Sequence, residues 1–274
     1  MSADRIHIEY QLRFTTPFHC GTGIRESLVD RTVTRDNKGY LYVPGSTYKG
    51  VLRDCCEQLA RFYEQDEQAK LRVHSPHNAK AALLELWNPR HTMVTRIFGS
   101  QNAPAQLFFD DARQLDDGIQ EYDGLDTSKS DPGISESDWK GKYKSLQVNV
   151  YTQVRIDRPT HTAVPGALYT SEFGAGDTVF QGTIQGWLKC TAIDPAGFEA
   201  VAQSNVTPTY SLLLLLAGLR MVDRLGGNKS TGKGRCECTI TRIGFNGVEV
   251  ESKAWESWLG QLDVLANYNR SQEG

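Results

Sequence analysis

Apolar and polar residues alternate along several stretches of this chain, and that two-residue period is typical of β-strands with one buried face. Residues 5–14 (RIHIEYQLRF) show it first, and it returns at 146–157 (LQVNVYTQVRID), 177–188 (DTVFQGTIQGWL) and 235–245 (RCECTITRIGF). The apolar run at 107–111 (LFFDD) predicts a further, buried strand. We therefore expect a sheet whose strands come from the whole length of the chain.

Two other stretches show helical spacing. Residues 39–65 pass from a strand through a Pro-Gly pair into a helix, with Ser46 placed as its N-cap. The apolar side of this helix is formed by Tyr48, Val51, Leu52, Cys55, Leu59 and Phe62. Residues 207–227 (TPTYSLLLLLAGLRMVDRLGG) predict a second helix that ends at its Gly-Gly pair. Strands interleaved with two helices predict an α+β fold with the helices on one face of the sheet.

The composition, 39% hydrophobic and 23% charged over 274 residues, is that of a soluble globular protein. We expect a single domain across 1–274. The longest apolar run, at 212–217, is far shorter than the roughly 20 residues of a membrane span, and the N-terminus lacks the apolar core of a signal peptide. The sequence therefore indicates a cytoplasmic protein with no membrane partner.

The six cysteines do not form a secreted disulfide framework, because Cys55 and Cys56 are neighbours and no CxxC spacing occurs. We expect reduced thiols. A zinc site built from Cys55, Cys56, His74 and His77 is an alternative that the sequence leaves open, although the spacing fits no standard zinc pattern.

The net charge of −3 by itself argues against a nucleic-acid-binding protein. The distribution of charge weakens that argument. The segment at about 114–145 holds eight acidic residues and four lysines, a local charge of −4 that leaves +1 for the rest of the chain. With few apolar anchors, this segment predicts a flexible acidic insertion.

The glycine-rich segment GGNKSTGKGR begins at Gly226 and contains the Gly-x-x-x-x-Gly-Lys spacing of a nucleotide-binding loop. The carboxylates that end residues 107–111 would then hold magnesium. Three features oppose an ATPase. Gly234 stands where that loop needs a Ser or Thr hydroxyl, and the segment follows a predicted helix and precedes a strand, the reverse of a phosphate cradle. The acidic strand end also precedes the glycine-rich loop, which reverses the usual order.

The same loop interleaves four glycines with Lys229, Ser230, Lys233 and Arg235. Glycines permit close backbone approach and the basic side chains supply charge, so the loop suits an extended polyphosphate chain; a turn with solvated lysines is the alternative. Lys49 and Arg53, four residues apart near the start of the first helix, form a second candidate phosphate site, unless both are simply solvated.

Five blocks, in a fixed order, together resemble one family. They are FHCGTG, LVDRTVTRDNKGYLYVPGSTYKGVLR, RIFGS followed by LFFDDAR, RIDRPTHTAVPGALYTSE, and LGGNKSTGKGR. Through nearly its whole length the chain is similar to the RAMP superfamily of CRISPR systems, specifically to the guide-RNA-binding backbone subunits of type III effector complexes. The resemblance implies a modified RNA-recognition-motif (ferredoxin-like) core with an inserted thumb hairpin and loops.

The resemblance also implies roles for individual residues. In active members an aspartate in the loop after the first strand cuts target RNA, and Asp30 occupies the matching position. It would orient a divalent cation, Mg²⁺ or Mn²⁺, or assist proton removal. A loop aspartate bonded to its own backbone is the alternative reading of Asp30, and Asp36 and Glu26 are the next candidates. The thumb-like segment at about 155–172 would interrupt the guide–target duplex.

The expected RNA contacts are His19, Ser46, Lys49, Arg53, Arg158, His161, Lys229, Ser230, Lys233 and Arg235. The implied partners are guide RNA, target RNA, other RAMP subunits, and the large and small subunits of the complex. The acidic insertion would face away from the guide or contact another subunit. Three functions stay open: a metal-dependent endoribonuclease subunit acting through Asp30, a non-catalytic subunit that holds guide RNA, and a metal-independent nuclease that processes the precursor transcript.

Overall fold

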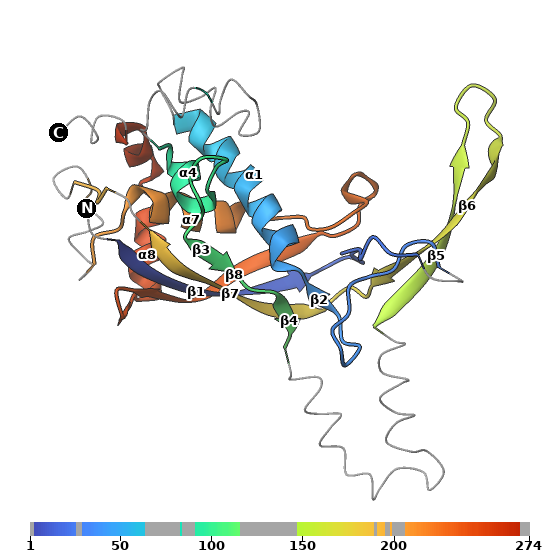
Figure 1. The fold of residues 1–274 in the computed structure, drawn as a ribbon, viewed down its shortest axis with the longest axis horizontal. Coiled ribbons are helices and arrows are strands. Elements are labelled where there is room, and N and C mark those ends of the chain that lie inside the picture. Colours follow the sequence, from blue (N-terminus) through green and yellow to red (C-terminus); the bar gives the residue numbers. More distant parts are fainter. Residues whose placement is uncertain are drawn as a thin grey trace, which may run out of the picture.

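The fold was obtained as a computed structural model of the chain (Figure 1). The structure describes residues 3–25, 29–63, 83, 91–115, 147–188, 191–194, 198 and 206–268. The strands of its main sheet are β1 (Asp4–Phe14), β2 (Tyr42–Val43), β3 (Leu107–Phe109), β4 (Ala112–Gln114), β7 (Val179–Leu188), β8 (Cys236–Phe245) and β9 (Val248–Glu249). The helices are α1 (Gly45–Tyr63), α4 (Met93–Phe98), α7 (Tyr210–Met221) and α8 (Ser252–Leu259), with short 3₁₀ segments η3 (Lys229–Thr231) and η4 (Leu262–Asn267).

The main sheet has a ferredoxin-like core. Its strands lie in the order β2-β4-β7-β1-β8-β9, and β3 also pairs with β7. Because β3 and β4 pair with successive parts of β7, they act as one interrupted strand. The chain then runs strand β1, helix α1, strand β3/β4, strand β7, helix α7, strand β8, which is the split βαβ pattern. The predicted α+β class is confirmed.

The helices cover one face of this sheet, as predicted (Figure 1). The core-facing residues of β1 are each at most 1% exposed; they are Ile6, Ile8, Tyr10, Leu12 and Phe14. All five leucines at 212–216 are fully buried, because α7 contacts α1, α4, α8 and β8. The opposite face of the sheet is open and carries paired charges, such as Arg242 with Glu9 at 3.6 Å.

The first predicted helix begins differently from the expectation. Gly45 is the first residue of α1, and its N–H donates to Oδ1 of Asp111 at 2.8 Å. A carboxylate from the sheet therefore satisfies a free N–H group at the helix start. The prediction that Ser46 is the N-cap was wrong, because Ser46 lies exposed within the first turn.

Two further expectations about the helices were wrong. Phe62 is 81% exposed, because the buried side of α1 is centred on Leu52 and Cys56 and Phe62 lies past its edge. The second helix does not end at its Gly-Gly pair. It ends at Met221, where Val222 turns to extended backbone, and Gly226 lies four residues further on in the loop.

Two strands form a separate sheet, a hairpin of β5 (Val148–Ile156) and β6 (Ala163–Gly174) that projects from the body of the molecule (Figure 1). The thumb-like segment at 155–172 lies within it. At the tip, the Asp157 N–H donates to the Thr162 carbonyl at 2.9 Å, and the Thr160 hydroxyl donates to the Asp157 carboxylate at 2.7 Å. The large aliphatic side chains exposed along the hairpin are Val150, Val154, Ile156 and Leu168.

Several expectations fall partly or wholly outside the described residues. The acidic insertion is one: Gln114 still ends β4 and the Leu115 N–H donates to the Val179 carbonyl at 3.1 Å, but residues 116–146 are not described. His74 and His77 also lie outside. Among the helices that are described, none combines the length and the apolar character needed to cross a membrane.

Candidate functional site

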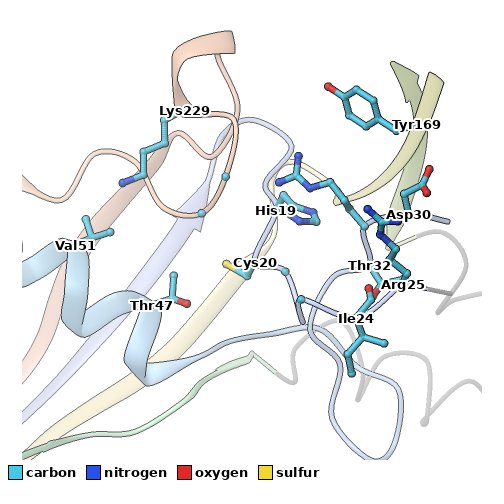
Figure 2. A pocket seen from close by; sticks show the side chains of 15 residues that line it. His19, Cys20, Ile24, Arg25, Asp30, Thr32, Thr47, Val51, Tyr169 and Lys229 are labelled. Atoms are coloured by element: carbon cyan, nitrogen blue, oxygen red, sulfur yellow. The ribbon is translucent and has the colours of Figure 1, made fainter. Parts of the chain in front are cut away.

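A cavity of about 750 Å³ lies where four segments of the chain meet (Figure 2). The loop after β1 supplies one wall, the start of α1 and the glycine-rich loop after α7 supply another, and Tyr169 of β6 reaches in from the hairpin. Figure 2 shows Lys229 on one side, above Thr47, and Arg25, Asp30 and Tyr169 on the other. Together with Arg31, which also lines the wall, the cations outnumber the one described carboxylate, so the cavity favours an anion.

Asp30 is held at this cavity by the base of the hairpin. Its Oδ2 accepts the backbone N–H of Thr170 at 2.9 Å and the Thr170 hydroxyl at 3.4 Å, while the Asp30 N–H donates to that hydroxyl at 3.2 Å. The two residues are 140 positions apart in the sequence. One carboxylate oxygen is thus fixed in orientation, and the hairpin determines where the carboxylate points.

His19 forms the floor of the cavity beside Asp30 and is 5% exposed. Its Nδ1 donates to the Glu172 carbonyl at 2.7 Å, so the neutral ring presents Nε2 as an acceptor. Burial lowers the pKa of His19 below its usual 6.5, and the charge of Arg31 acts in the same direction. The ring is therefore neutral at pH 7. A Cβ at Gly21 would lie 2.7 Å from Nε2, so a glycine at this position keeps that nitrogen uncovered.

The glycine-rich loop packs against the loop after β1. The Gly227 N–H donates to the His19 carbonyl at 2.8 Å, and the Arg31 guanidinium donates to Oδ1 of Asn228 at 3.2 Å. Gly226 has φ +86°, and a Cβ there would lie 2.4 Å from the His19 carbonyl oxygen. The loop follows helix α7 and leads into strand β8, as predicted, so it does not open an α-helix as a nucleotide-binding loop does.

Three predicted site residues line the cavity: His19, Asp30 and Lys229. The predicted RNA contacts that do not line it are Ser46, Lys49, Arg53, Arg158, His161, Ser230, Lys233 and Arg235. Arg158 and His161 are exposed in the turn that joins β5 to β6, at the tip of the hairpin. The structure therefore divides the predicted set into a cavity group, a helix group, a hairpin-tip group, and a group at 230–235 that lies outside the cavity.

The basic pair on α1 points away from the cavity. Thr47 lines it, whereas Nζ of Lys49 lies 5.4 Å from the centre of the Phe109 ring. Burial, followed by the nearby charge of Arg53, lowers the pKa of Lys49. Nε of Arg53 donates to Oε1 of Glu57 at 2.8 Å. A phosphate at this position would have to compete with Glu57 for Arg53.

Arg25, Arg31, Tyr169 and Thr170 were not predicted from the sequence. The two arginines flank Asp30 in one loop, so a search for cations around the candidate carboxylate would have found them. Tyr169 and Thr170 carry no such local signal, because only the pairing of β6 with the loop after β1 brings Tyr169 to the cavity and Thr170 to Asp30.

The described residues contain no cluster of three or more His, Cys, Asp or Glu side chains that could hold a metal ion. Asp30 alone would be a protein ligand, which suits Mg²⁺ because that ion commonly takes one or two carboxylates and fills its remaining positions with phosphate oxygens and water. Burial raises the pKa of the Cys55 thiol to about 11, so this thiol is protonated at pH 7 when no metal is bound.

A family model described as RAMP superfamily matches residues 11–237. No curated protein sequence matches the chain. Solved structures of type III-B Cmr-beta are similar: one bound to cognate target RNA has a TM-score of 0.49 at 14% identity, covering 85% of this chain and 96% of that chain. The other, in the apo state, has a TM-score of 0.48 at 15% identity, covering 86% and 97%.

Proposed function

Because this chain belongs to the RAMP superfamily, we propose that it is a guide-RNA-binding backbone subunit of a type III CRISPR effector complex that cuts bound target RNA at Asp30. The observation that carries the proposal is the cavity itself. Asp30 is its one described carboxylate, and it lies among Arg25, Arg31 and Lys229, beside a projecting hairpin. Such a site favours a polyanion and places one acid–base group against it.

The proposed RNA path uses the cavity group and the helix group in different ways. Lys229 would hold a phosphate at the cavity. Lys49 and Arg53 on α1 would contact the guide backbone. Other RAMP subunits and the large and small subunits of the complex would flank this chain along the guide.

The proposed reaction is attack of a ribose 2′-hydroxyl on the adjacent phosphorus, with departure of the 5′ oxygen in line. The Asp30 carboxylate would accept or position the 2′-hydroxyl proton, help that contributes about 10²- to 10⁴-fold in rate. Thr170 fixes the orientation of that carboxylate. A divalent cation bound there would supply Lewis-acid stabilisation of the phosphate charge. The thumb hairpin would distort the RNA locally so that the attacking and leaving oxygens align.

A non-catalytic role in holding guide RNA is the second candidate. One observation favours it: Oδ2 of Asp30 is already bonded to the backbone and hydroxyl of Thr170, as it would be if the carboxylate only anchored the hairpin. The two candidates differ in whether the chemistry depends on the Asp30 carboxylate.

The test is cleavage of target RNA by the reconstituted guide complex with Mg²⁺, comparing wild type with Asp30→Asn. Asparagine keeps an oxygen that can accept from Thr170 but removes the charge. We expect cleavage to fall by about 10²-fold or more while target affinity stays unchanged. Removal of Mg²⁺ with a chelator should stop wild-type cleavage.

The matched control is Asp36→Asn. Oδ1 of Asp36 accepts the backbone N–H groups of Lys38 and Tyr40, both at 2.9 Å, and Asp36 lies outside the cavity. This variant should cut normally. Undiminished cleavage by Asp30→Asn, or no cleavage by wild type, would leave the chain as a scaffold.

A further inference from the structure

Lys233 occupies a different environment from the other lysine of the glycine-rich loop. Its Nζ lies 4.5 Å from the centre of the Tyr151 ring and 5.4 Å from that of Phe173. Lys229 is exposed and lines the cavity. Two lysines four residues apart in one loop therefore have different surroundings: Lys229 faces the cavity, and Lys233 lies over a pair of aromatic rings.

The two rings belong to the base of the hairpin, one on each strand. Tyr151 pairs with Ser171 across the ladder, and Phe173 is two residues further along β6, so both rings lie on one face. They meet edge to face at 5.4 Å, and Phe173 in turn lies 5.6 Å from the His19 ring. A row of contacts thus runs from the Lys233 ammonium group through the two hairpin rings to the His19 ring at the floor of the cavity.

The hairpin depends on such contacts at its base. It forms a sheet of its own, and an isolated two-stranded ribbon is marginally stable in water. Its other ties also lie near the base: the Phe18 bridge to Gly174, and the Glu172 carboxylate, which accepts the Val33 N–H at 3.2 Å. Asp30 takes its orientation from Thr170 on this same hairpin. The angle of the hairpin therefore sets the position of Asp30.

We propose that Lys233 is a positioning residue, which fixes the hairpin base against the glycine-rich loop through the Tyr151 and Phe173 rings and does not contact RNA phosphate. The effect of Lys233 on cleavage rests on the proposed function, whereas its role in holding the hairpin base does not. Lys233 then connects the glycine-rich loop, which we propose holds RNA, to the hairpin, which orients Asp30.

The first experiment measures hydrogen exchange in the free protein over 148–156 and 163–174. Lys233→Met keeps the length of the side chain and removes the charge, so exchange at the hairpin base should rise about two- to fivefold. Lys233→Arg should behave as wild type, because a guanidinium also lies favourably over aromatic rings. Lys229→Met, the matched control in the same loop, should leave exchange unchanged.

The second experiment measures affinity for guide RNA against salt concentration. Lys229→Met should reduce the magnitude of the log–log slope by about 0.7, the value for one lost phosphate contact on a single strand. Lys233→Met should leave the slope unchanged and lower the single-turnover cleavage rate, and Lys233→Arg should restore that rate.

Unchanged exchange together with a smaller salt slope in Lys233→Met would overturn the proposal and make Lys233 a phosphate ligand. If Lys233→Met does not fold, Tyr151→Leu removes the ring and keeps the charge, and it should raise exchange with the salt slope unchanged. If wild type binds no RNA, the proposed function fails, but the exchange comparison still decides the role of Lys233.

Discussion

Two glycines of the glycine-rich loop are required for different physical reasons. Gly226 and Gly232 both have positive φ, +86° and +82°. A Cβ at Gly226 would lie 2.4 Å from the His19 carbonyl oxygen, whereas a Cβ at Gly232 meets nothing within 4 Å. The first glycine is required by a close backbone contact as well as by its conformation, and the second by its conformation alone.

This difference predicts two sizes of destabilisation. Gly232→Ala should lower the free energy of unfolding by about 1–2 kcal/mol, the cost of a left-handed residue with a Cβ. Gly226→Ala should lower it by about 2–4 kcal/mol, because the loop must also move away from His19. Urea unfolding of both variants measures the two losses. Equal losses would mean that the loop can move away from His19 without a further decrease in the free energy of unfolding.

The sequence predicts the position of α1 well, but only the tertiary contacts show how its start is capped and how its two basic residues differ. Its start is capped by Asp111 from the sheet, and Arg53 is held by Glu57 on the helix itself. Lys49 lies half-buried over Phe109. The basic flank that the sequence presents as two equivalent phosphate ligands thus contains one neutralised guanidinium and one ammonium with no carboxylate partner among the described residues.

The difference between the two basic residues can be measured as a salt dependence. Lys49→Ala should reduce the magnitude of the log–log slope of guide-RNA binding by about 0.7. Arg53→Ala should reduce it by less, because Glu57 already offsets the charge. Lys253→Ala, an exposed lysine on the distant helix α8, is the control and should not change the slope. An unchanged slope in Lys49→Ala would remove Lys49 from the RNA path.

At the scale of the molecule, the described residues form a ferredoxin-like body and a hairpin that shares no strand with the main sheet. The core is built from β1, β7, β8 and the helices, and the outer part of the hairpin is exposed. Folding of the body therefore should not require the outer hairpin, whereas the proposed cutting of a guide–target duplex should.

Trimming the hairpin tests this separation. Residues 155–167 would be replaced by Asn-Gly, which joins Val154 to its ladder partner Leu168 and keeps the base. The melting temperature should stay within about 2 °C of wild type, since less than about 1 kcal/mol is lost. Target cleavage should fall by about tenfold or more because the RNA is no longer distorted in line. Loss of cooperative unfolding would show instead that the outer hairpin supports the body.

The sequence by itself determined the elements and the family. Strands β1, β5, β7 and β8 and the two long helices follow from the period of apolar residues, because that period records which face of each segment is buried. Motif order along the chain indicated the RAMP superfamily and singled out Asp30. Predictions were wrong at Ser46 and Phe62, where helix boundaries and burial depend on residues elsewhere in the chain.

Only the tertiary structure decided which of these residues act together. Thr170 reaches Asp30 across 140 positions, Gly226 lies against His19, and the Lys233 ammonium group lies over two rings of the hairpin. Contacts of this kind arise from the pairing of β6 with the loop after β1 and from the packing of the glycine-rich loop on both. The local sequence pattern carries no information about such pairings, because the hydrophobic period and the turn residues of each segment are the same whether or not the other segment packs against it.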